Sequence, residues 1–179
     1  MTNPTLLLVT GLPGSGKTSL AEGIAKDLDA AVLGHDWVMA ALRVFPTVWN
    51  AMGELEHLTF RSVGWSVMWN LALAQLHEGR SVILDGVARA PEVQRTRDVA
   101  NEAECSSFVA LCSITDARIH RERVIDRARN IPSWPELTWE EVERSRSDWA
   151  PPADVDLVLN TLDPADANLV ELLLALCGK

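Results

Sequence analysis

The hydrophobic positions of this chain form short continuous runs that alternate with longer stretches in which apolar and charged residues interleave. The short runs, such as Val82 to Leu84, have the composition of strands that are buried on both faces. Five runs are predicted as strands: residues 5–10, 31–33, 81–84, 107–112 and 155–160. Because helical patterns lie between them, we expect an α/β fold, with a doubly wound parallel sheet and helices on both faces.

Capping residues and prolines mark the helix starts. Thr115 or Asp116 can cap one helix, and Thr138 with Glu141 fits a capping box for the next. The first predicted helix opens at Lys17 and carries Leu20, Ile24 and Leu28 on its apolar stripe. Further helices are predicted at residues 37–44, 65–76, 92–103, 116–128 and 138–149, and the last one begins at Pro164.

The length of 179 residues fits one domain, predicted to span residues 1–179. The longest interval between predicted strands is residues 33–81, which is more than a simple crossover needs. An additional element is therefore expected at about residues 36–80. Residues 130–137 contain two prolines and are the most loop-like interior stretch.

The segment after the first strand, Gly11-Leu-Pro-Gly-Ser-Gly-Lys-Thr, matches the phosphate-binding pattern G-x-x-x-x-G-K-[ST] at every specified position. Glycines let backbone N–H groups turn toward phosphate oxygens, Lys17 reaches the β- and γ-phosphates, and the Thr18 hydroxyl is suited to Mg²⁺. The dipole of the helix that opens at Lys17 favours an anion at the same place. Nucleotide binding is predicted at Gly11, Leu12, Pro13, Gly14, Ser15, Gly16, Lys17, Thr18 and Ser19.

The net charge indicates which substrates are favoured, and the cysteine content indicates the redox state of the thiols. Sixteen Lys and Arg against 25 Asp and Glu leave a formal net charge of −9, which disfavours nucleic acid and favours small-molecule substrates. Three cysteines without metal-ligand spacing indicate reduced thiols. No basic leader precedes Leu6 and no apolar run approaches membrane-spanning length, so a cytoplasmic protein without membrane attachment is expected.

Two aspartates follow predicted strands, at the sheet edge where α/β proteins place their ligands. Asp36 is suited to act as a general base on an acceptor hydroxyl, and the alternative is an N-cap for residues 37–44. Asp85 is suited, together with Thr18, to hold Mg²⁺ or its water ligands. The alternative for Asp85 is a turn-forming role before Gly86.

Residues 116–129 hold a cluster of positive charge: Arg118, Arg121, Arg123, Arg127 and Arg129. Arg123 and Arg127 are four residues apart, so they are predicted to share a helix face and to clamp the phosphates during transfer. The alternative is a solvated face paired with Glu122 and Asp126. This alternative is preferred for Arg118 and considered for Arg129.

Three residues close in sequence to the aspartates are candidates for acceptor binding. His35 is a second acid–base or contact candidate, although a lone histidine is more often structural. Trp37 is the best aromatic candidate for a pocket wall, and Arg89 is close enough to Asp85 to reach an acceptor. Core packing is preferred for other tryptophans, because Trp65, Met68, Trp69, Ala72 and Leu76 recur at helical spacing.

Taken together, the Gly11–Thr18 segment, Asp36, the strand that ends at Asp85 and the pair Arg123 and Arg127 resemble the P-loop kinases of the nucleoside-monophosphate-kinase-like group. The chain is most similar to the single-domain branch that includes polynucleotide 5′-kinase domains, zeta-type toxins, chloramphenicol phosphotransferase and gluconate kinase. The resemblance covers about residues 5–161.

This resemblance implies a P-loop NTPase three-layer sandwich, with a five-stranded parallel sheet in the order 2-3-1-4-5. It also implies a small mobile lid at about residues 116–137, and phosphoryl transfer from ATP with Mg²⁺ to an acceptor hydroxyl. By the same resemblance, Asp36 falls where the acceptor-binding base lies, and Arg123 and Arg127 fall where lid arginines lie.

One position departs from the family pattern. Several relatives place an arginine three residues after the aspartate to hold an acceptor phosphate, whereas this chain has Met39. The departure argues against an acceptor that already carries phosphate. The leading hypothesis is a kinase of a small hydroxyl compound; the alternatives are a nucleotide-binding switch that acts on a protein partner and, less favoured, a nucleic-acid end kinase.

Overall fold

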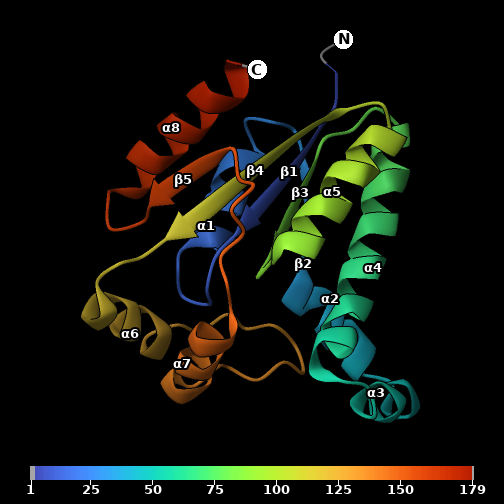
Figure 1. The fold of residues 1–179 in the computed structure, drawn as a ribbon, viewed down its shortest axis with the longest axis vertical. Coiled ribbons are helices and arrows are strands. Elements are labelled where there is room, and N and C mark those ends of the chain that lie inside the picture. The colour runs from blue at the N-terminus through green and yellow to red at the C-terminus, as the bar shows by residue number, and fades with distance from the viewer. Residues whose placement is uncertain (1–2, 179) are drawn as a thin grey trace.

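A five-stranded parallel sheet forms the centre of the computed structural model, which describes residues 3–178 (Figure 1). Residues 1–2 and 179 of the predicted domain lie outside the described residues. The strands are β1 (Thr5–Thr10), β2 (Ala31–Gly34), β3 (Val82–Gly86), β4 (Ser106–Ser113) and β5 (Leu157–Asn160). Their order, β2-β3-β1-β4-β5, confirms the order that the resemblance implied.

Helices cover both faces of this sheet, with α4 and α5 on one face and α1 and α8 on the other (Figure 1). The helices are α1 (Lys17–Ala25), α2 (His35–Arg43), α3 (Pro46–Gly53), α4 (His57–His77), α5 (Ala90–Glu102), α6 (Ala117–Ile125), α7 (Trp139–Asp148) and α8 (Ala165–Cys177). The long interval between β2 and β3 therefore contains three helices, α2, α3 and α4, where an additional element was expected. Among the described residues, none of these helices has the length and hydrophobicity needed to span a membrane.

The continuous apolar runs of the central strands follow from burial on both sides. In β1, Leu6 and Leu8 pack in the cluster with α4 and α5, whereas Leu7 and Val9 pack in the cluster with α1 and α8. Trp65 of α4 is fully buried in the first cluster, so its predicted core role is confirmed. Truncation of such a fully buried tryptophan to alanine costs about 3–5 kcal/mol.

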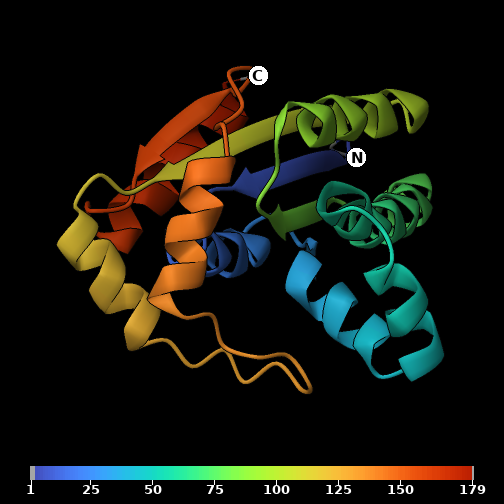
Figure 2. The same ribbon diagram turned by 60° about the horizontal axis from the view of Figure 1, so that its bottom comes forward.

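The carboxyl ends of the strands meet at one edge of the sheet, where the candidate residues lie. In the strand register Val9, Gly34 and Asp85 stand side by side, because β3 pairs with both β1 and β2. Figure 2 shows α6 and α7 on one side of this edge and α2 and α3 on the other. The segment that joins α6 to α7 extends toward α2 and α3 (Figure 2).

Two helices end three residues earlier than predicted, whereas the other predicted ends differ by about one residue. Helix α1 ends at Ala25, so Leu28 lies in the following turn, where Asp29 adopts a left-handed φ of 46° and the Ala30 N–H donates to the Ala25 carbonyl. Helix α6 ends at Ile125 rather than near Ala128.

The early end of α6 corrects the predicted arginine pair. The N–H of Arg129, which a continued helix would direct at the carbonyl four residues earlier, instead donates to Glu136 Oε1 at 2.8 Å. Arg127 consequently lies beyond the helix, and it does not share a helix face with Arg123.

Candidate active site

The loop between β1 and α1 has the backbone shape of a phosphate cradle. Gly14 and Gly16 have φ values of 81° and 84°, a left-handed conformation that side chains with a Cβ rarely adopt. A Cβ at Gly14 would lie 2.5 Å from Val124 Cγ2, so this position also requires glycine for space. The N–H groups of the first turn of α1 have no partners within the helix, and they are therefore oriented for an anion at this loop.

Lys17 is buried at the start of α1, and its Nζ lies 3.4 Å from the Leu12 carbonyl. Burial lowers the pKa of the lysine, and the nearby carboxylates of Asp85 and Asp36 oppose that shift. The weak bond to Leu12 is its one hydrogen bond among the described residues. The ammonium group is therefore positioned to exchange this contact for phosphate oxygens.

Thr18 and Asp85 meet across the sheet edge. The Thr18 hydroxyl donates to Asp85 Oδ2 at 2.7 Å, although the two residues are 67 positions apart in the chain. Asp85 is buried at the end of β3, and burial raises the pKa of its carboxyl, against the opposing charge of Lys17 and the hydrogen bond from Thr18.

This pair fits a Mg²⁺ ion. Asp85 Oδ1 is buried and has no hydrogen-bond partner among residues 3–178, so a cation or its water ligand would satisfy it. The described residues contain no group of three or more His, Cys, Asp or Glu side chains that could hold a metal by itself. A metal bound here would therefore take its remaining oxygen ligands from phosphate and water.

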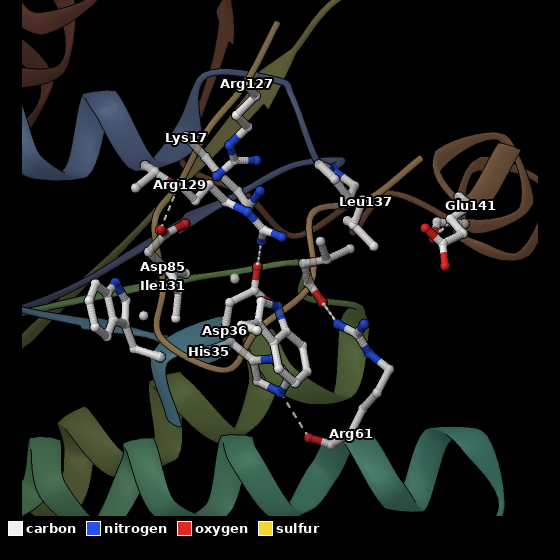
Figure 3. Close-up of a pocket in the computed structure, with 18 of the residues that line it drawn as sticks. Lys17, His35, Asp36, Arg61, Asp85, Arg127, Arg129, Ile131, Leu137 and Glu141 are labelled. Carbon is white, nitrogen blue, oxygen red and sulfur yellow. Dashed lines mark hydrogen bonds and ion pairs between the residues drawn. The ribbon is translucent and has the colours of Figure 1, made fainter. Parts of the chain in front are cut away.

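Asp36 lies in the first turn of α2, and Gly34 is the N-cap residue, with no side-chain cap. The N-cap alternative for Asp36 is therefore wrong, because β2 runs directly into a helix that begins one residue earlier, at His35. The Asp36 carboxylate instead forms an ion pair with Arg129 (Figure 3). It projects into the space between the P-loop and the α6–α7 segment.

Arg129 is the functional candidate that the sequence interpretation missed. Its side chain is only 6% exposed and also pairs with Glu136 at 2.9 Å, so it does not belong to a solvated face. Arg118, in contrast, forms the expected exposed pair with Glu122 at 2.7 Å. The spacing of the five arginines along the chain does not distinguish these two environments.

His35 lines the cavity but has a structural partner. Its Nε2 donates to the Arg61 carbonyl at 3.0 Å, and its ring lies against Trp65, with 5.4 Å between centroids. Burial lowers the pKa of the imidazole, so the neutral form is favoured. These contacts support a role in fixing α2 against α4.

Arg123 and Arg127 occupy different places. Arg123 donates to the Thr161 carbonyl at 2.8 Å, which attaches α6 to the end of β5. Arg127 lies closer to the P-loop, where burial lowers its pKa and the carboxylates of Asp36 and Asp85 partly compensate.

Two cavities open at the carboxyl edge of the sheet and meet at the P-loop. The larger has a volume of about 740 Å³ and contains Asp36, Asp85 and the exposed ring of Trp37 in its lining. The smaller, of about 400 Å³, lies between α1, α6 and the β5–α8 connection. Both are lined by Lys17, Thr18, Ser19 and Arg127.

The wall of the larger cavity brings together predicted and unpredicted arginines. Arg89, a predicted acceptor contact, is the N-cap residue of α5 and lines this cavity. Arg61 of α4 lines it as well and was not predicted, because its distance in sequence from both aspartates gives no indication of proximity.

His120 joins the P-loop to α7. Its Nε2 donates to the Pro13 carbonyl at 2.7 Å, and its Nδ1 accepts from Arg146 at 2.6 Å. Burial lowers the pKa of this fully buried imidazole, and the two bonds require the neutral Nε2–H tautomer. Protonation of His120 at Nδ1 would therefore break its bond to Arg146 of α7, whereas the Nε2–H bond to the Pro13 carbonyl would remain.

A P-loop that follows the central strand of a sheet in this order, with a buried aspartate beside the loop threonine, defines the P-loop kinase fold. The chain belongs to the family described as AAA domain, whose model matches residues 6–152.

Similar proteins are known from sequence. Uncharacterized proteins of Mycobacterium tuberculosis and Mycobacterium bovis are 30% identical over 128 residues, which is 69% of this chain and 26% of each relative. The chain thus spans about a quarter of the length of the curated relatives it matches.

Solved structures share the fold over almost the whole chain. A gluconokinase from Sinorhizobium meliloti is 17% identical, with a TM-score of 0.65, and 98% of this chain and 92% of that chain are covered. An APS kinase from Mycobacterium tuberculosis, solved with AMPPNP and APS, is 21% identical, with a TM-score of 0.65 and 97% of both chains covered. A shikimate kinase from Bacteroides thetaiotaomicron is 17% identical, with a TM-score of 0.60, over 97% of this chain and 98% of that chain.

Proposed function

We propose that this chain is an ATP- and Mg²⁺-dependent phosphotransferase that moves the γ-phosphoryl group to a hydroxyl of a small molecule, with Asp36 as the general base. The observation that carries the proposal is the meeting of two cavities at Lys17, Thr18, Ser19 and Arg127. The smaller cavity suits the phosphoryl donor, and the larger cavity, which contains Asp36, suits the acceptor. The residues that both cavities share would surround the phosphoryl group during its transfer.

The smaller cavity is proposed to hold the nucleoside of ATP. It opens from the P-loop toward Thr161 and the apolar Leu169, so a nucleotide whose phosphates lie in the loop would direct its nucleoside there. The solved APS kinase in complex with AMPPNP and APS shows that this fold accommodates a nucleotide and a second small molecule together.

The charge that develops on the γ-phosphoryl group is proposed to be balanced by Lys17 and Arg127. Arg127 lines both cavities, and the nearby carboxylates of Asp36 and Asp85 favour its charged form. Thr18 and Asp85 would hold Mg²⁺, which supplies further positive charge to the phosphates when bound. Positioning and electrostatics account for most of the catalysis expected in phosphoryl transfer.

Asp36 is proposed to accept the proton of the acceptor hydroxyl. Arg129 contacts its Oδ2, and its Oδ1 has no hydrogen-bond donor among the described residues. The ion pair would hold the carboxylate in one orientation, so that the hydroxyl approaches the second oxygen on the side of the P-loop.

A screen of ADP release tests this function. Wild type and Asp36→Asn are compared against hydroxyl-bearing metabolites, antibiotics and a 5′-hydroxyl oligonucleotide, and AMPPNP affinity is measured in parallel. Transfer is expected to be abolished in Asp36→Asn while AMPPNP affinity changes little. Asp27→Asn, an exposed change just after α1, is the matched control.

Other outcomes would redirect the proposal. Equal activity of Asp36→Asn and wild type would remove Asp36 from the role of base. Stimulation of ADP release by a protein fraction and by none of the hydroxyl compounds would favour a nucleotide-dependent switch, and a response to the oligonucleotide alone would favour an end kinase.

A further inference from the structure

Arg61 and Arg89 form a pair of positive charges without a carboxylate partner on the wall of the larger cavity. Arg61 comes from the first turns of α4, and Arg89 is the N-cap residue of α5. Neither side chain takes part in an ion pair within residues 3–178. The cavity wall therefore contains two guanidinium groups that form no direct ion pair with a carboxylate of the described residues.

Arg61 is only partly satisfied by its structural bond. One Nη2 hydrogen bond to the Val87 carbonyl, at 3.1 Å, attaches α4 to the β3–α5 connection (Figure 3). Its Nε is buried and has no partner among the described residues. A guanidinium carries five donors in a planar fork, so a purely structural role leaves most of them unused.

The two guanidinium charges are close enough to repel one another. Burial and the charge of Arg89 both lower the pKa of Arg61, and burial together with the charges of both arginines lowers the pKa of nearby His57. The acidic groups that reach Arg61 are already engaged, since Asp36 pairs with Arg129 and Glu92 accepts from the Arg89 N–H.

We propose that Arg61 and Arg89 bind an oxyanion group of the acceptor, a carboxylate, sulfate or phosphate, while the reacting hydroxyl of the same molecule faces Asp36. This inference rests on the proposed function for the identity of the ligand as acceptor. Planar guanidinium groups match the two oxygens of such an anion, and an anion would satisfy the buried Nε and relieve the repulsion between the two arginines.

The structure also removes the argument against an anionic acceptor that Met39 suggested. Met39 is 1% exposed, and its sulfur faces Gly64 of α4 in the core. Position 39 therefore does not face the cavity, and Arg61 provides the positive charge from α4 instead.

A binding experiment tests the anion site directly. Protein saturated with Mg²⁺ and AMPPNP, so that the P-loop is filled, is titrated with sulfate, inorganic phosphate and acetate while the tryptophan side-chain NMR signals are followed. Arg61→Gln or Arg89→Gln is expected to weaken the preferred anion by at least about tenfold. Arg95→Gln, an exposed arginine paired with Glu102 outside the cavity, is expected to bind like wild type.

Further variants separate recognition from folding. Arg61→Lys, which keeps the charge without the planar fork, is expected to bind with intermediate affinity. Arg89→Gln removes a side chain that makes no hydrogen bond among the described residues, so it decides the question if Arg61→Gln does not fold. Equal anion affinity in wild type, Arg89→Gln and any folded Arg61 variant would overturn the inference.

A kinetic experiment identifies the anion as part of the acceptor. ADP release is measured with matched compounds such as glycerol, glycerate and glycerol phosphate, and with a nucleoside and its monophosphate. An anionic member of a set is expected to react fastest, and Arg61→Gln is expected to raise its KM by at least about tenfold with a smaller change in kcat. Preference for neutral compounds, unchanged in Arg61→Gln, would overturn the anionic acceptor but leave the phosphotransferase intact.

The two proposals fail in different ways. Arginine-dependent sulfate, phosphate or acetate binding without ADP release from any acceptor would retain the anion site and contradict the phosphotransferase.

Discussion

The guanidinium of Arg129 pairs with the carboxylate of Asp36 and connects the segment after α6 to the first turn of α2, across 93 positions of sequence (Figure 3). Arg129 also donates to the Pro135 carbonyl at 2.8 Å and pairs with Glu136. One buried side chain therefore fixes both the proposed base and the fold of the α6–α7 segment over the larger cavity.

Arg129→Gln is expected to lower kcat for the acceptor by about tenfold or more, because Asp36 loses its orientation. The KM for ATP is expected to change little. The free energy of unfolding should fall by about 1.5–3 kcal/mol, the range for a hydrogen bond to a charged group. Steady-state ADP release and urea unfolding provide the measurements.

Two further variants distinguish a positioning role for Arg129 from a structural one. Arg129→Lys should restore part of kcat, and Arg118→Gln, which removes only an exposed pair, should behave as wild type. A loss of stability in Arg129→Gln with an unchanged kcat would contradict the positioning role.

Asp85→Asn is expected to raise the Mg²⁺ concentration needed for half-maximal AMPPNP binding by about tenfold, because a metal-binding charge is lost. The same variant should unfold less readily at neutral pH. Burial raises the folded-state pKa of Asp85 above its unfolded value, so ionisation of this carboxyl destabilises the fold as pH rises. From pH about 4 upward, the free energy of unfolding of Asp85→Asn should exceed that of wild type by an increasing amount. A difference that shrinks as pH rises would contradict the direction of the pKa shift.

Lys17→Met is expected to reduce AMPPNP affinity by at least about tenfold, since a buried charge–phosphate contact is removed. The nucleotide-free protein should be at least as stable as wild type, because burial disfavours the charged lysine and its bond to the Leu12 carbonyl is long, at 3.4 Å. Thermal unfolding with and without AMPPNP measures both effects. A strongly destabilised nucleotide-free variant would show that Lys17 has a structural role.

His120 is expected to make stability depend on pH. Its folded-state pKa lies below the unfolded value because of burial, so stability is present above pH about 6.5 and is lost as pH falls toward the folded-state pKa. Urea unfolding should show that the free energy of unfolding falls more between pH about 7.5 and about 5.5 in wild type than in His120→Gln. His77→Gln, an exposed change at the end of α4, serves as the control, and equal losses in wild type and His120→Gln would rule out the effect.

Local pattern was sufficient to predict the sheet, the P-loop and the position of Asp85 beside it. The five strands were predicted close to their observed bounds, because runs such as Leu6 to Val9 are apolar on both faces only when helices cover both sides. The P-loop was identified because its glycines, Lys17 and Thr18 are contiguous, and the backbone alone determines their relative positions. Asp85 could be placed beside Thr18 because parallel strands bring their carboxyl ends to one edge.

The α6–α7 segment and the position of Arg61 on the wall of the larger cavity could not be predicted in this way. The four-residue spacing of Arg123 and Arg127 suggested a shared helix face, but the contacts of Arg129 with Glu136 and Asp36 are made by a chain that has left the helix at Ile125. Tertiary contacts of a single side chain here outweigh the modest preference of a short exposed segment to continue as a helix.

By itself, the sequence determined that the chain is an α/β protein with a P-loop and an aspartate at the end of a neighbouring strand, since periodicity and contiguous motifs depend on short-range geometry. Only the tertiary structure decided that Asp36 pairs with Arg129 and that Arg61 and Arg89 face one cavity. These side chains come from separate helices and loops, and no local rule relates their positions until packing of the helices against the sheet brings them together.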